Sequence, residues 1–123
     1  MVSHESVESL RASAEEDLWT ANLVKDKDDE KTRIICFHLQ QYAEKMLKAK
    51  LLEKGIQYPR KHDLVSLLEL FGNKEILDKH IENAANLSDY ATAFRYERRI
   101  PSIEEMKAAF TSDQSMVSDI NGL

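Results

Sequence analysis

The chain has 123 residues, of which 42% are hydrophobic and 32% are charged, and its formal net charge is −5. This composition is typical of a globular protein, and one domain spanning residues 1–123 is expected. No apolar run reaches the roughly 18–20 residues that cross a bilayer, the polar N-terminus is unlike a secretory signal, and the single Cys36 cannot form an internal disulfide, so a cytoplasmic protein is expected.

Charge is segregated along the chain. Residues 1–30 carry nine acidic and three basic residues, whereas residues 31–62 carry eight basic and two acidic ones. The acidic total disfavours broad, non-specific binding to nucleic acid, but a basic belt on an acidic protein suits one anionic partner at a defined place. Alternatively, the acidic and basic segments form salt bridges between neighbouring helices.

Helical periodicity begins near the N-terminus. The apolar residues that step by three and four in this segment are Val7, Leu10, Ala14, Leu18 and Ala21. They predict a helix over about residues 3–24, with Trp19 flanking the stripe. The polar sequence KDKDDE at 25–30 predicts a break, in which Asp26 or Asp28 caps the start of the next helix by accepting backbone hydrogen bonds.

The second predicted helix is the longest and ends near Gly55. Its apolar row consists of Ile35, Leu39, Tyr42, Met46 and Ala49, with Cys36, Ala43 and Leu47 beside it. The opposite side carries His38, Gln41, Lys45 and Lys48. Because Cys36 lies on the apolar row, it is expected to be a buried, inert thiol rather than a nucleophile.

Three further helices follow. Asp63 is the expected N-cap of a short helix that ends at the Gly-Asn pair 72–73, and a fourth helix is expected from about Lys74 to Arg99. Pro101 stops the fourth helix, and Ser102 begins the last one through an S-x-x-E capping box. The predicted fold is therefore all-α, an up-and-down bundle of four long helices and one short helix.

The sequence FRYERRIP at 94–101 concentrates Arg95, Tyr96, Arg98 and Arg99 before a proline. Cations at a helix C-terminus interact favourably with the helix dipole, by about 0.3–1 kcal/mol each, and this alone accounts for basic residues here. Three arginines with a tyrosine, however, also suit phosphate, because the planar guanidinium binds phosphate in a bidentate manner. Both interpretations stay open on the residues alone.

Other site types find little support. No glycine-rich phosphate loop and no H-E-x-x-H pattern occur, and the four histidines show no paired metal-ligand spacing. The sequence DKDD at 26–29 lacks the Gly-Ser turn of a nucleotidyltransferase and is better explained as a solvated cap. The His62–Asp63 pair is better explained as an N-cap and its neighbour than as a metal site. No metal, cofactor or catalytic residue is therefore predicted.

Three blocks of the sequence resemble the HEPN family (higher eukaryotes and prokaryotes nucleotide-binding domain). They are CFHLQQYAEKMLKAKLL at 36–52, YPRKHDLVSLLEL at 58–70 and LSDYATAFRYERRIP at 87–101. Each block alone is ordinary helical sequence, but their order and spacing match the small, stand-alone prokaryotic type. The resemblance implies a helical bundle that usually forms homodimers through its helices.

The resemblance also implies two classes of function. Some HEPN proteins are metal-independent ribonuclease toxins with an R-x(4–6)-H signature. Others are non-catalytic partners of minimal nucleotidyltransferases in toxin–antitoxin-like pairs. Counted from Arg95, the signature histidine would fall on Ile100, Pro101 or Ser102, and no histidine follows His80. The ribonuclease signature is therefore absent, and the resemblance favours the nucleotidyltransferase-associated class.

We therefore predict a cytoplasmic homodimer that binds the phosphate of a nucleotide or RNA for a separate nucleotidyltransferase. The expected contacts are Arg95, Tyr96 and Arg99, with Arg98 more peripheral, and His38 and Lys45 as secondary candidates that are otherwise solvated surface residues. The alternatives are a ribonuclease toxin with its base displaced to His62 or His38, and a purely structural interaction module.

Overall fold

Five helices make up the part of the chain that the computed structural model describes, namely residues 6–60, 63–96 and 100–123, with residues 91–96 described by their backbone alone. The helices are α1 (Val7–Lys27), α2 (Thr32–Glu53), α3 (Leu64–Glu69), α4 (Lys74–Tyr96) and α5 (Ile103–Asn121). No strand occurs in these residues. The predicted all-α bundle of four long helices and one short helix is confirmed.

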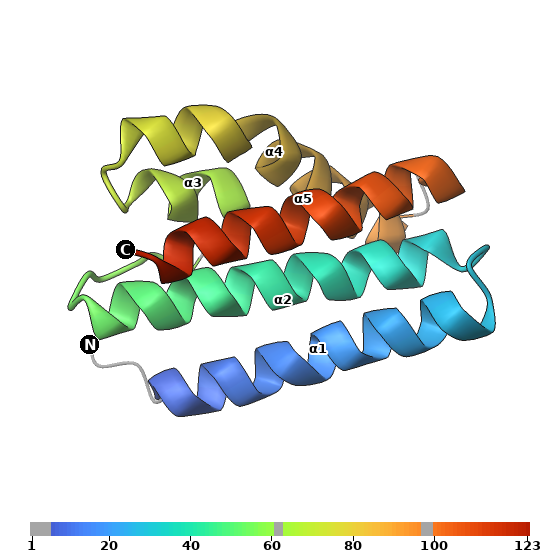
Figure 1. Cartoon of the computed structure of the whole chain (residues 1–123), viewed down its shortest axis with the longest axis horizontal. Coiled ribbons are helices and arrows are strands. Elements are labelled where there is room, and N and C mark those ends of the chain that lie inside the picture. The colour runs from blue at the N-terminus through green and yellow to red at the C-terminus, as the bar shows by residue number, and fades with distance from the viewer. Residues whose placement is uncertain (1–5, 61–62, 97–99) are drawn as a thin grey trace.

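Helix α2 is the centre of the bundle. It packs against each of the other four helices, with α1 on one side and α3, α4 and α5 on the other (Figure 1). This position explains the predicted apolar row, of which Ile35, Leu39 and Ala49 are fully buried, as are Ala43 and Leu47 beside it. Burying one such Leu or Ile side chain contributes roughly 1.5–3 kcal/mol of transfer free energy, so this row dominates the stability of the core.

Helices α1 and α2 form an antiparallel hairpin, whose turn corrects two predictions. Helix α1 continues to Lys27, since the lysines of its last turn favour the negative end of the helix dipole. Asp28 closes α1, and its side chain accepts a hydrogen bond from the backbone N–H of Glu30. The N-cap of α2 is Lys31, which makes no side-chain cap, so neither Asp26 nor Asp28 has the predicted role.

Helix α2 ends as predicted at Gly55, whose φ of 73° is in the left-handed region that glycine tolerates. Asp63 caps α3 by accepting the backbone N–H of Val65 at 3.1 Å, as predicted. Gly72, with φ 64°, then separates α3 from α4. These stops fix where α4 begins.

Helix α5 begins at the predicted capping box. The Ser102 hydroxyl accepts the N–H of Glu105 at 3.0 Å, and the Glu105 carboxylate accepts the N–H of Ser102 at 2.9 Å. Because this box satisfies two backbone donors at once, it fixes the first turn of α5 directly after Pro101. The last described residue of α4 is Tyr96. The predicted end of this helix at Arg99 lies outside the described residues.

Trp19 departs from its predicted place beside the α1 stripe. It stands five residues after the buried Ala14, about 140° further around the helix at 3.6 residues per turn. Its side chain therefore faces away from α2 and is 65% exposed.

No helix in the described residues has a stretch long and apolar enough to span a bilayer.

Candidate functional site

The predicted phosphate contacts lie at and beyond the end of α4. Arg95 and Tyr96 are its last two residues, and they are described by backbone position alone. Arg98 and Arg99 lie outside the described residues. Figure 1 shows the last turns of α4 approaching the first half of α2. The site can therefore be built from its surroundings on α2 and α1.

Pro101 holds the chain after the arginines against the start of α2. Its carbonyl accepts a hydrogen bond from the Thr32 hydroxyl at 2.6 Å, and both residues are buried. Thr32 is flanked in sequence by Lys31, which is exposed, and by Arg33, which is half-buried. The residue two positions beyond Arg99 is thus fixed next to two further bases. Asp28, Asp29 and Glu30 directly precede Lys31, so the charge at this end is mixed, and an anion would have to be bound by the individual bases.

His38 and Lys45 meet at one carboxylate of α1. Asp17 lies 2.8 Å from His38 Nδ1 through its Oδ1, and it accepts a hydrogen bond from Lys45 Nζ at 2.6 Å through its Oδ2. The side chains of His38 and Lys45 are only 26% and 25% exposed. Their predicted alternative as solvated surface residues is therefore wrong, because Asp17 draws both toward the helix interface.

The Asp17 carboxylate also orients the His38 ring. With Nδ1 engaged, Nε2 is the ring nitrogen that has no hydrogen-bond partner among the described residues.

The sequence contained a signal for this cluster that the prediction missed. Asp17 is three residues after Ala14 and four before Ala21, so it is a lone carboxylate on the buried stripe of α1. A carboxylate in that position requires a donor from the neighbouring helix.

A second polar row on α2 is structural. Gln40 donates to Glu44 at 3.0 Å, and Lys48 pairs with the other Glu44 oxygen at 2.9 Å. All three residues are buried, although Lys48 lies on the side of α2 opposite the predicted apolar row. Lys48 Nζ also lies 5.5 Å from the ring centroid of Tyr58. Because removing either ion would leave the other buried and unpaired, Lys48 holds the fold together and is not free to bind an anion.

A groove lies between α4 and α5, where the small residues of α5 face carboxamides of α4. Its volume is about 360 Å³, and its lining includes Asn83, Asn86, Ala108 and Ala109. At one end Tyr90 donates a hydrogen bond to Glu105 at 3.2 Å. The charged residues of the lining are Lys79, Glu82 and Glu105, which leave an acidic balance. Phosphate is therefore not favoured in this groove.

His80 is a buried structural residue. Its Nε2 lies 2.7 Å from the carboxylate of Asp119, which also accepts a hydrogen bond from Lys79 at 2.9 Å. The hydrogen bond from His80, followed by that from Lys79, lowers the pKa of Asp119. Within the described ranges, no three His, Cys, Asp or Glu residues gather as a metal site would require.

The core carries one more unexpected carboxyl group. Asp113 of α5 is fully buried, and neither of its oxygens has a hydrogen-bond partner in the described part of the chain. Burial raises the pKa of Asp113 well above its ordinary value of 3.8. Burial, with Glu105 and Asp113 nearby, raises the pKa of Cys36 to about 12. Cys36 is thus buried and kept in its thiol form, which confirms the predicted inert thiol.

Comparison with known proteins agrees with this architecture. No curated protein and no solved structure gives a significant match to the chain. The model of the HEPN domain matches residues 7–120, from the first residue of α1 to the penultimate residue of α5. The match covers nearly the whole chain, and it includes the three blocks that carry the resemblance. The chain therefore belongs to the HEPN family.

Proposed function

We propose that this protein binds the phosphate of a nucleotide or RNA through the segment that ends α4, and that it does so without cleaving it. Membership in the HEPN family supports a function related to nucleotides or RNA. Arg95, Tyr96 and Arg99 are the proposed main contacts, and Arg98 is more peripheral. Lys45 and His38 have a secondary role, because the Asp17 carboxylate already occupies both side chains.

The hydrogen bond between Thr32 and Pro101 is the observation that carries this proposal. It fixes the chain directly after the arginines at the start of α2, beside Lys31 and Arg33. Cations held on a buried anchor bind phosphate at a lower entropic cost than cations on a free segment, since less motion is lost on binding.

The proposal assigns the chemistry to another chain. Local acid–base catalysis near neutral pH needs a group such as imidazole, and no histidine follows His80 in the sequence. We therefore assign the protein the role of substrate-binding partner to a separate minimal nucleotidyltransferase in a toxin–antitoxin-like pair. In this role it acts as a cytoplasmic homodimer.

Binding of ATP, GTP and a short single-stranded RNA, measured by titration calorimetry, tests the phosphate contacts. Arg95→Ala with Arg99→Ala is expected to weaken binding at least tenfold, since a charge-assisted hydrogen bond contributes about 1.5–3 kcal/mol. The melting temperature should stay nearly unchanged. Lys74→Ala with Lys107→Ala removes two exposed charges elsewhere and is expected to leave affinity unchanged.

Two results would contradict the proposal. If no nucleotide or RNA binds the parent protein, the chain is better explained as a structural interaction module. If the arginine and lysine pairs weaken binding equally, the effect is one of net charge rather than of a site. Co-purification with the protein encoded in the neighbouring reading frame tests the nucleotidyltransferase partnership separately.

A second candidate function is that of a ribonuclease with a displaced histidine. The Asp17–His38 pair favours it, because a carboxylate at Nδ1 leaves Nε2 available for proton transfer, as in other carboxylate–histidine pairs. The test is cleavage of a labelled RNA in EDTA. This candidate requires 2′,3′-cyclic phosphate products that disappear in His38→Ala but persist in His80→Ala. Intact RNA with the parent protein excludes it.

A further inference from the structure

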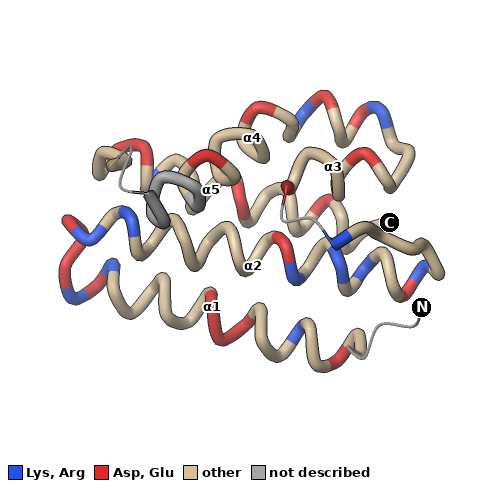
Figure 2. The backbone as a smooth tube through the Cα atoms, turned by 180° about the vertical axis from the view of Figure 1, so that it is seen from behind, with Lys and Arg blue, Asp and Glu red and all other residues tan. Residues whose placement is uncertain are grey.

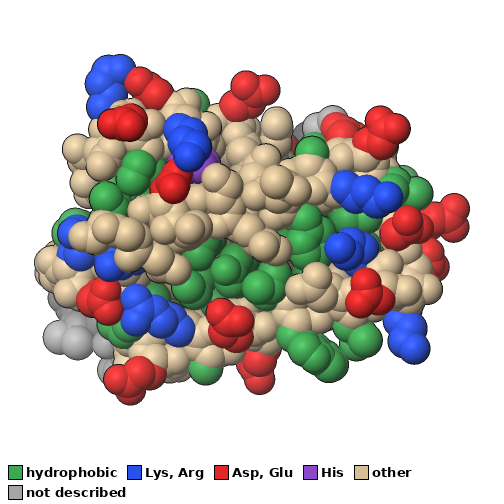
Figure 3. All heavy atoms as spheres, viewed as in Figure 1, with side chains coloured by type: hydrophobic (Ala, Val, Ile, Leu, Met, Phe, Trp, Pro, Cys, Tyr) green, Lys and Arg blue, Asp and Glu red, His purple; other side chains and the backbone are tan. Residues whose placement is uncertain are grey.

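The outward face of α1 has no partner in the described fold. Helix α1 packs along α2, and its backbone comes within packing distance of no other described helix. Trp19 and Leu23, one turn apart on this face, are 65% and 40% exposed. Figure 3 shows apolar side chains at the lower edge of the molecule, over α1. An indole exposed to this degree costs solvation free energy unless another surface covers it.

The spacing of this face suits a helix. Ala12, also exposed, stands seven residues before Trp19, and Leu23 stands four after it. From Ala12 to Leu23 the face is about 16 Å long, or three helical turns. Trp19 and Leu23 are its large apolar side chains, and Ala12 is small enough to let a second helix approach closely.

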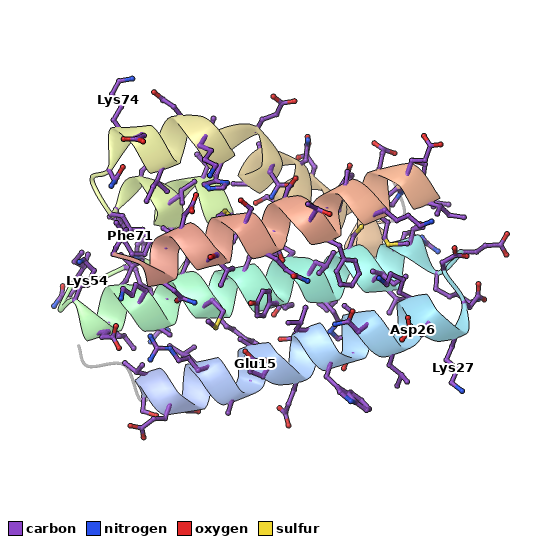
Figure 4. All side chains as sticks on the ribbon, in the orientation of Figure 1. Glu15, Asp26, Lys27, Lys54, Phe71 and Lys74 are labelled. Atoms are coloured by element: carbon purple, nitrogen blue, oxygen red, sulfur yellow. The ribbon has the colours of Figure 1, made fainter. Side chains whose placement is uncertain are left out.

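Acidic residues border the apolar positions. Glu8, Glu15, Glu16 and Asp26 are all exposed on α1, and Lys27 is the one exposed base on this helix. Figure 4 shows Glu15 and Asp26 along α1, with Lys27 extending away from the molecule at its end. None of the four acids forms an ion pair with another described residue, whereas Arg11 is paired with Glu53 of α2. The border is therefore a field of uncompensated negative charge.

We propose that this face, formed by Ala12, Trp19 and Leu23 with its acidic border, docks a basic amphipathic helix of a partner protein. Apolar residues of the partner would cover Trp19 and Leu23, and its flanking lysines or arginines would face the four acids. The same face of a second copy would bring acid against acid, and anionic lipids or nucleic acid would be repelled. This docking site is separate from the arginine segment and does not depend on phosphate binding.

Trp19 is the single tryptophan of the chain, so its fluorescence reports on this face directly. The probe is a 14-residue helical peptide with leucines spaced by three and four and lysines elsewhere. Adding it to the full chain is expected to shift the Trp19 emission to shorter wavelength, with saturation. A peptide of the same pattern with glutamates in place of lysines is expected to cause no shift.

Variants separate a docking face from general charge attraction. Glu15→Gln with Glu16→Gln is expected to weaken binding of the lysine peptide at least fivefold, as is Leu23→Ala. Glu69→Gln with Glu75→Gln makes the same change in net charge on exposed positions of α3 and α4, and should leave affinity unchanged. Equal weakening by both pairs, binding of both peptides, or the absence of a shift would overturn the proposal. A shift caused by raising the protein concentration alone, or by anionic phosphatidylserine vesicles, would also overturn it.

Discussion

Single carboxyl groups in the interior decide much of the pH behaviour that this protein should show. Asp113 is surrounded by the core, where burial first, and the nearby Asp113 carboxylate to a smaller extent, raise the pKa of both Cys36 and Tyr42. An unpaired buried carboxylate costs several kcal/mol, so burial instead favours the protonated carboxyl. Asp17 is also buried, but each of its two carboxylate oxygens has a partner on α2, namely His38 or Lys45.

Asp113→Asn tests this difference through the pH dependence of stability. A raised pKa means that the folded chain binds the proton more tightly than the unfolded chain. The free energy of unfolding therefore falls as pH rises above 3.8 and stops falling once the folded-state pKa is passed. Within that window the variant should gain about 1.4 kcal/mol relative to the parent per pH unit, as measured by urea denaturation.

Asp119 provides a control of opposite sign. Hydrogen bonds from His80 and Lys79 lower its pKa, so its contribution is present above pH 3.8 and is lost as pH falls through the folded-state pKa. Asp119→Asn should accordingly flatten the acid side of the profile only. If the Asp113→Asn and parent curves run parallel from pH 4 upward, Asp113 is not protonated by burial.

The apolar stripes predicted most buried residues from the sequence, but not these polar ones. Asp17 and Asp113 occupy helix positions where the three- and four-residue spacing calls for an apolar side chain. Periodicity indicates that such a residue is buried, but it does not reveal whether a partner is present. For Asp17 the partners came from a different helix, and for Asp113 the described structure offers none.

At the scale of helices, end signals with a strong local chemistry were predictable. Gly55, Asp63 and the Ser102–Glu105 box all have their predicted roles. The start of α2 was not predictable, because Lys31 makes no side-chain cap. What fixes this start is a tertiary hydrogen bond from Thr32 to Pro101, which lies 69 residues away in sequence. Local spacing contains no information about such a bond.

Thr32→Val tests this anchor between α2 and the α4–α5 connection. The change keeps the side-chain shape but leaves the buried Pro101 carbonyl without its donor, at a cost of about 1–3 kcal/mol in the free energy of unfolding. Thr20→Val is the matched control, because Thr20 donates to the Glu16 carbonyl at the exposed surface of α1. If urea denaturation gives the same loss in the free energy of unfolding for both variants, the Thr32–Pro101 hydrogen bond stabilises the fold no more than a local bond at the surface does.

For the whole molecule, charge segregation has two outcomes. Asp17 of the acidic first segment does form a salt bridge with Lys45 of the basic second one, whereas Arg11–Glu53 pairs a base of the first segment with an acid of the second. The rest divides along the chain, with exposed acids on α1, while the α1–α2 turn and the start of α2 carry both acidic and basic residues (Figure 2). The sequence predicted the blocks, but only the antiparallel α1–α2 hairpin determines which charges pair and which remain available for partners.

The salt dependence of RNA binding tests the central proposal most directly. For a single strand, the logarithm of the binding constant falls with the logarithm of salt concentration by about 0.7 per phosphate contact. Arg95→Gln with Arg99→Gln should therefore reduce this slope by about 1.4 in magnitude, with the RNA recovered intact. A slope that is the same in parent and variant would contradict phosphate binding by the segment that ends α4.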